Sequence, residues 1–193
     1  MSPRSFAIAD TCFLIDWARY RHKGILFKLF STVFVPEQVL DEVRSEETIS
    51  WITRGLTEGV LALYTPVASE IEEARQLIER SHLHPQLPSM ELPEALCLVA
   101  GRRRGYIVLT ENRAALLAPR VFRDYGSVSV WRALEVILEA VKTGILEADC
   151  NRPGRVFEEY ASDTLHVFPT KALQTAVEEV RRICGMRGSS LTR

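Results

Sequence analysis

The sequence predicts an α/β fold, a three-layer α/β/α sandwich with a central parallel sheet, followed by a C-terminal helical extension. Short apolar runs that fit strands alternate with amphipathic segments that fit helices from residue 6 to about residue 146. Parallel strands need long, usually helical crossovers, and such helices cover both faces of the sheet. Beyond Pro153-Gly154 the alternation stops and one long amphipathic pattern follows.

Five segments read as strands because each is a short apolar or alternating run bounded by turn residues or polar residues. The second is followed by Pro36, which fits the first turn of a helix, and the fourth ends immediately before Thr110-Glu111-Asn112. The five segments are Phe6–Ala9, Val33–Val35, Val60–Tyr64, Tyr106–Leu109 and a short run at Val128.

The expected helices have apolar residues spaced three and four apart. Ser69-Glu70-Ile71-Glu72 has the capping-box pattern that starts a helix, whereas residues 81–89, with their histidines and prolines, are expected to form a loop. A glycine, either Gly101 or Gly105, should end the helix that begins near Leu92. The helices are expected at residues 11–20, 25–30, 36–43, 49–56, 69–80, 92–100, 113–117 and 130–143, with one more over 172–183.

These elements divide the chain of 193 residues into three parts. Residues 1–148 form the sandwich, residues 149–185 form the helical extension, and residues 186–193, rich in Gly, Ser and Arg, are expected to be a disordered tail. A chain of this length can bury a core without staples. The extension is expected to dock rather than to act as a linker, because residues from Ala172 to Ile183 give one helical face an apolar surface.

Composition excludes some classes of protein and leaves the chemistry open. A formal charge of −1 excludes binding of nucleic acid by overall positive charge, and 47% hydrophobic residues exclude a disordered chain. The four cysteines are scattered without a C-x-x-C pair, so we expect reduced thiols, no disulfide framework and a cytoplasmic location. No apolar run approaches the roughly 18 residues of a membrane helix.

Four acidic residues from separate segments are the candidate catalytic groups: Asp10, Glu42, Glu94 and Glu111. Ligands of open parallel sheets bind beyond the carboxyl ends of the strands. Asp10 and Glu111 each follow a predicted strand, and Glu94 lies in the first turn of a predicted helix, so all three are expected near that edge. Clustered carboxylates repel one another and usually need a cation. An all-oxygen site without His or Cys favours Mg²⁺ or Mn²⁺ over Zn²⁺. Asp10 is the strongest candidate, because a charge between an apolar strand and an apolar helix is costly.

Four motifs, in order along residues 6–146, resemble those of PIN-domain nucleases. The first is Ile8-Ala9-Asp10-Thr11-Cys12-Phe13-Leu14-Ile15-Asp16, and the second is Val35-Pro36-Glu37-Gln38-Val39-Leu40-Asp41-Glu42-Val43. The third and fourth are Leu92-Pro93-Glu94-Ala95 and Tyr106-Ile107-Val108-Leu109-Thr110-Glu111-Asn112. Each motif alone is weak, whereas the four together, at the family's spacing, are fairly specific.

The resemblance implies a Mg²⁺- or Mn²⁺-dependent endoribonuclease with a Rossmann-like sandwich. Many such proteins are the toxin of a toxin–antitoxin pair (VapC-like), which implies RNA, an antitoxin protein and a second copy in a homodimer as partners. Asp10, Glu42 and Glu94 match the family's first three acidic positions. Asn112 stands where the family often has Asp, so the expected metal ligands are Asp10, Glu94, Glu111 and the Asn112 carbonyl.

Substrate contacts are assigned to Thr11, Arg102 and Arg113. Thr11 fits a helix N-cap as well as a hydrogen bond to the site. Arg102 begins an arginine triplet that fits phosphate binding, but cations at helix C-termini are common without any ligand. His166 and Trp131 are assigned to packing only.

Two further hypotheses stay open. A catalytically degenerate PIN domain would bind RNA or a protein without cutting, which the Asn112 departure favours. A receiver-like domain with regulatory Mg²⁺ would need a Lys after a later strand, where this chain has Thr110 and Ser129, so this hypothesis ranks last.

Overall fold

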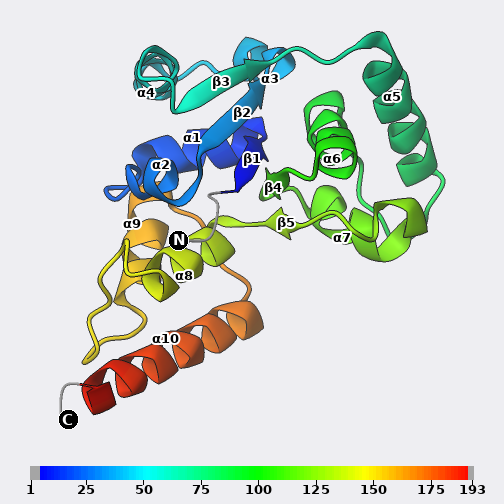
Figure 1. Ribbon diagram of the computed structural model, residues 1–193. Helices are drawn as coiled ribbons and strands as arrows, with labels where there is room; N and C mark the ends of the chain where they lie inside the picture. Colours follow the sequence, from blue (N-terminus) through cyan, green and yellow to red (C-terminus); the bar gives the residue numbers. More distant parts are fainter. Residues whose placement is uncertain (1–4, 191–193) are drawn as a thin grey trace.

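A five-stranded, all-parallel sheet forms the centre of the protein in a computed structural model that describes residues 5–190, the last four as backbone only. The strand order is β3-β2-β1-β4-β5, and helices cover both faces (Figure 1), which confirms the predicted α/β sandwich. The strands are β1 Phe6–Ala9, β2 Thr32–Pro36, β3 Leu61–Tyr64, β4 Ile107–Leu109 and β5 Val130–Trp131.

The central position of β1 places the end of this strand at the middle of the sheet. Ile8 pairs with Phe34 of β2 on one side and with Val108 of β4 on the other. The order of the strands reverses at β1, and such a switch point creates a crevice at the carboxyl ends of the strands. Asp10, the next residue after β1, therefore lies where a ligand site is expected.

Helices connect the strands and form the outer layers. One face of the sheet is covered by α5, α6 and α7, and the other by α1, α8 and the helices of the extension (Figure 1). The helices are α1 Thr11–Arg19, α2 Ile25–Leu29, α3 Glu37–Glu42, α4 Glu46–Thr57, α5 Ala68–His82, α6 Leu92–Arg104, α7 Arg113–Val121, α8 Ala133–Lys142, α9 Arg155–Thr164 and α10 Thr170–Ser190.

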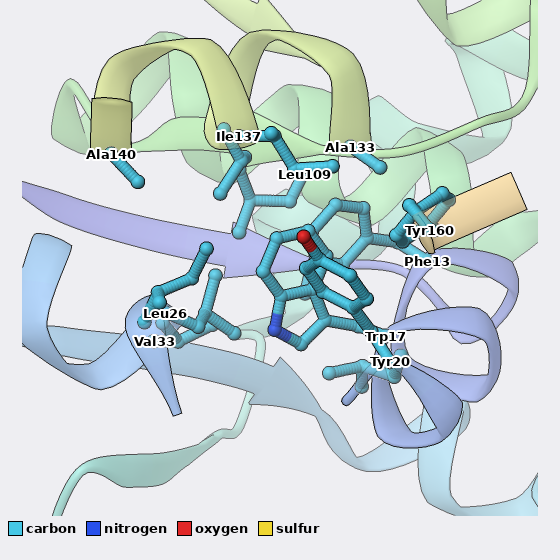
Figure 2. Packing of buried hydrophobic residues seen from close by; sticks show 14 of the residues in the cluster. Phe13, Trp17, Tyr20, Leu26, Val33, Leu109, Ala133, Ile137, Ala140 and Tyr160 are labelled. Atoms are coloured by element: carbon cyan, nitrogen blue, oxygen red, sulfur yellow. The ribbon is translucent and has the colours of Figure 1, made fainter. Parts of the chain in front are cut away.

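Two apolar cores lie on opposite faces of the sheet because alternate strand residues point to opposite sides. Ala7 and Ala9 belong to the core beneath α1 and α8, whereas Ile8 belongs to the core beneath α6. Figure 2 shows the first core, in which the Trp17 ring stacks on Phe13 at 5.2 Å and lies near Tyr160 of α9. Aromatic pairs of this kind contribute about 0.5–1.5 kcal/mol beyond their buried area.

The extension is part of that first core. Phe157 and Tyr160 of α9 are buried, as are Ala176, Val180 and Ile183 of α10. The docking of the 172–183 face is as predicted, whereas α9, over residues 155–164, was not predicted although Val156, Phe157 and Tyr160 give it an apolar face.

A disulfide between Cys150 and Cys184 joins the start of the extension to α10. The prediction of four reduced thiols was therefore wrong for this pair; Cys12 and Cys97 are free. The two cysteines are 34 positions apart in the sequence, and only the docking of α10 brings them together. Sequence spacing alone could not reveal it.

Several element ends also differ from expectation. Helix α5 begins at Ala68, one residue earlier than predicted, with Val67 rather than Ser69 as its N-cap, since the Glu70 carboxylate accepts a hydrogen bond from the Val67 backbone at 3.0 Å. Val130, expected in a helix, pairs with Val108 as β5, and α8 begins at Ala133. Helix α10 continues to Ser190, past the expected start of a disordered tail, because extending a formed helix needs no new nucleus. Residues 191–193 of that tail lie outside the described residues.

Gly105 ends α6 in the left-handed conformation, with φ 72°, as glycine permits without strain. Within residues 5–190, none of the helices is both long enough and apolar enough to cross a membrane.

Candidate functional site

Asp10 is the centre of the candidate site and is completely buried. One carboxylate oxygen accepts a hydrogen bond from the Phe13 backbone N–H at 2.9 Å, which caps α1, and the other accepts one from the Thr110 hydroxyl. Asp10 is therefore the N-cap of α1, a role that the sequence had suggested for Thr11. The loop after β4 brings Thr110 to this carboxylate.

Burial is the largest cause that raises the pKa of Asp10 from 3.8 to about 7. The hydrogen bonds from Thr110 and Phe13 act in the opposite direction. The negative charges of Glu94 and Glu42 raise the pKa as well, which means that both side chains lie close enough to repel Asp10. The structure thus brings three of the four predicted acidic residues into one electrostatic group.

Glu94 enters this group from the first turn of α6. One of its oxygens accepts a hydrogen bond from the Glu91 backbone at 3.2 Å, and the other accepts one from the Asn112 amide nitrogen at 3.2 Å. Burial raises its pKa, and the neighbouring Glu91 and Glu42 add to the effect.

Glu42 is the exposed member of the group and lies at the end of α3. The Thr11 hydroxyl donates a hydrogen bond to its carboxylate at 2.5 Å. Thr11 is therefore a positioning residue for Glu42 in this structure.

Asn112 faces the site with its NH₂ group. Its side-chain carbonyl accepts hydrogen bonds from the Ala114 and Ala115 backbones at 2.8 Å and 3.2 Å and so caps α7. The predicted role of that carbonyl as a metal ligand does not fit this arrangement. The N-cap preference of Asn before a helix was the signal in the sequence that indicated the cap.

Glu111 points away from this group, toward α8. Its carboxylate accepts a hydrogen bond from the Ala133 backbone at 2.8 Å and lies 3.4 Å from the His166 ring. Burial is the main cause that raises its pKa to about 7. Asp10 still contributes to this shift, so Glu111 lies at the edge of the site rather than within it.

His166 links the extension to that edge. Its ring lies between Glu111 and Asp16 of α1, with 3.7 Å between its second nitrogen and the Asp16 carboxylate. Burial is the largest cause that lowers its pKa. The sequence had suggested packing alone for His166, since nothing in its neighbourhood predicted a contact with residues 55 and 150 positions earlier.

The carboxylate and hydroxyl oxygens around Asp10 suit a hard divalent cation, whereas the NH₂ group of Asn112 cannot bind one. Within residues 5–190, no three His, Cys, Asp or Glu side chains converge closely enough to hold an ion as they stand. The carboxylates are instead held by Thr11, Thr110 and Asn112. Binding of Mg²⁺ or Mn²⁺ thus stays a prediction.

The two candidate arginines differ. The Arg102 guanidinium forms an ion pair with Glu73 of α5 at 2.6 Å and lies over the Tyr125 ring. It is thus neutralised on the face of α5 and α6. Arg113, in contrast, lines a pocket beside Glu111.

A scan against family models and a search of curated proteins both found no match to this sequence. The function of the site is therefore inferred from its own residues and their resemblance to the PIN motifs.

Proposed function

We propose that the protein is a Mg²⁺- or Mn²⁺-dependent endoribonuclease that hydrolyses RNA phosphodiester bonds. The observation that carries the proposal is the burial of Asp10 at the switch point of the sheet, with Glu94 and Glu42 close enough to raise its pKa. Repulsion among buried carboxylates is tolerated where a cation relieves it. The four PIN-like motifs support the same activity.

A bound divalent cation would supply charge neutralisation of the phosphate and an activated water. Asp10 and Glu94 would hold it, because both carboxylates are fixed by hydrogen bonds and face the same group. Glu42, the exposed carboxylate, is within reach of solvent, so we assign to it the proton that the attacking water loses. Water would then attack phosphorus while Glu42, held by Thr11, takes its proton; the bond to the leaving oxygen would break, and this oxygen would take a proton from solvent.

The test compares wild type with Asp10→Asn on a mixed RNA pool, with Mn²⁺ and with EDTA. Wild type should cut RNA only with the metal, and the variant should not cut. Asp41→Asn is the matched control, since it removes the same charge from an exposed residue beside Glu42. Cleavage that persists in Asp10→Asn would overturn the proposal.

A degenerate domain that binds RNA or a protein without cutting is the second candidate. The cap formed by the Asn112 carbonyl favours it, because this oxygen is taken by the helix. RNA binding without metal-dependent cleavage, measured on the same wild-type preparation, would establish it.

RNA, an antitoxin protein and a homodimer partner belong to this proposal, as does a cytoplasmic location. A small reading frame beside the gene is the expected sign of an antitoxin, and its absence would remove that partner. The Cys150–Cys184 bond counts against a cytoplasmic location, because disulfides are rare in reducing compartments.

A further inference from the structure

A pocket of about 480 Å³ adjoins the acidic site at the β5 edge of the sheet. It is enclosed by α7, by the start of α8 and by residues 166–169, which connect the two helices of the extension. Its walls carry Arg113 and Arg120 of α7 and Arg132 before α8, and its apolar part includes Leu116 and Val130. The extension and the sandwich therefore build this pocket together.

The charge of the pocket is positive. Arg132 is paired with Glu135 at 2.5 Å. Arg113 and Arg120 lie two turns apart on α7 and line the same pocket, and neither has a carboxylate partner among the described residues. Two free guanidinium groups in a concave site suit a phosphate, which they can bind through several parallel hydrogen bonds.

Glu111 connects the pocket to Asp10. Its carboxylate lines the pocket, it follows directly after Thr110, and Thr110 donates its hydroxyl hydrogen bond to Asp10. A strand of RNA whose reacting phosphate lies at Asp10 would thus bring a neighbouring nucleotide to the pocket. The volume and the apolar wall leave room for its sugar or base beside the arginines.

We propose that this pocket binds the phosphate of a nucleotide next to the bond that is cut, with Arg113 and Arg120 as the phosphate ligands and the extension as its outer wall. This inference rests on the proposed ribonuclease function. An acidic segment of a protein partner could use the same arginines. The presence of Glu111 in the pocket wall favours RNA, because a strand bound at Asp10 could extend along this edge of the site.

The experiment measures binding of a fluorescent single-stranded RNA by anisotropy in the Asp10→Asn background, where no cutting is expected. Arg113→Gln and Arg120→Gln should each raise the Kd roughly 10-fold, the usual effect of losing a hydrogen bond to a charged group. Each should also lower the slope of log K against log salt by about 0.7, one phosphate contact on a single strand. Arg75→Gln is the matched control, an exposed arginine of α5 outside the pocket, and should change neither quantity.

The results separate the pocket from the proposed function. If both arginine variants bind RNA more weakly but the wild type never cuts RNA, the phosphate-binding proposal would stand and the proposed nuclease activity would be wrong. An unchanged Kd and salt slope would overturn the proposal that the pocket binds an RNA phosphate, and so would a wild-type protein that binds no RNA. Either result would leave a protein partner as the ligand of the two arginines. Inorganic phosphate that displaces the RNA at constant ionic strength and submillimolar concentration would overturn the assignment to the RNA backbone.

Discussion

Asp10→Asn is expected to stabilise the metal-free protein, although it removes the proposed catalytic charge. Asn keeps a carbonyl that can accept the hydrogen bond from the Phe13 backbone, and its NH₂ group can face the Thr110 hydroxyl, which now contacts the carboxylate. What changes is the cost of a buried negative charge near Glu94 and Glu42.

The magnitude follows from the pKa of Asp10, which burial raises from 3.8 to about 7. In the unfolded chain the carboxyl group loses its proton near the lower value, whereas the folded protein keeps it up to the higher value. The stability that this raised pKa provides is therefore complete in acid and is lost as the pH rises to about 7. The shift of about 3 units corresponds to roughly 4 kcal/mol at about 1.4 kcal/mol per unit.

The assay is urea unfolding in EDTA, followed by tryptophan fluorescence, near pH 4 and near pH 8. The two proteins should have similar free energies of unfolding in acid, and Asp10→Asn should be the more stable by about 2–4 kcal/mol at the higher pH. Other carboxylates titrate in both proteins, so most of their contribution cancels in this difference. Asp41→Asn, on the exposed face of α3, should show no such pH dependence.

A difference between wild type and Asp10→Asn that does not vary with pH would refute the reasoning, because the buried charge would then cost nothing. Mn²⁺ added at about 100 times its Kd should stabilise wild type by about 2.7 kcal/mol and the variant much less. Equal stabilisation of both would show that the metal binds away from Asp10.

Two other changes test the packing. Cys150→Ser should lower the free energy of unfolding by about 4 kcal/mol, from the loop-closure entropy of a 34-residue separation. Cys12→Ser, at a free thiol, is the control in denaturant unfolding; four free thiols in the unreduced, denatured protein would contradict the bond to Cys184. Gly101→Ala should cost about 1–3 kcal/mol by overpacking, since its Cβ would lie 2.6 Å from a methyl group of Val108. An unchanged melting temperature would show that β4 can move aside.

The fold could be predicted because strand and helix periods differ and each run is bounded by clear breakers. Helix α7 shows where this reasoning ends. The sequence predicted a helix over residues 113–117, yet the helix extends through Pro119 to Val121. Pro119 has no backbone N–H to donate within the helix, and α7 continues past it despite the loss of that hydrogen bond.

The site was predictable in part. Asp10, Glu42 and Glu94 gather because topology brings the carboxyl ends of β1 and β2 and the start of α6 together. The direction of Glu111 could not be predicted, since its partners are the Ala133 backbone and His166, both placed by tertiary packing. Sequence position gives the neighbourhood of a side chain, whereas its partner depends on which distant segment docks there.

The central place of β1 has a consequence for the order in which the protein is made. β1 leaves the ribosome before the other four strands, yet Ala7 pairs with Ile107, a hundred residues later. At about 5–20 residues per second, translation takes roughly 5–20 s to cover that interval, during which one edge of β1 lacks its partner and is open to wrong pairing. Thr110, which holds Asp10, also arrives only then. Under the proposed function, an incomplete chain is harmless to RNA, including the messenger that encodes it, until β4 joins the sheet.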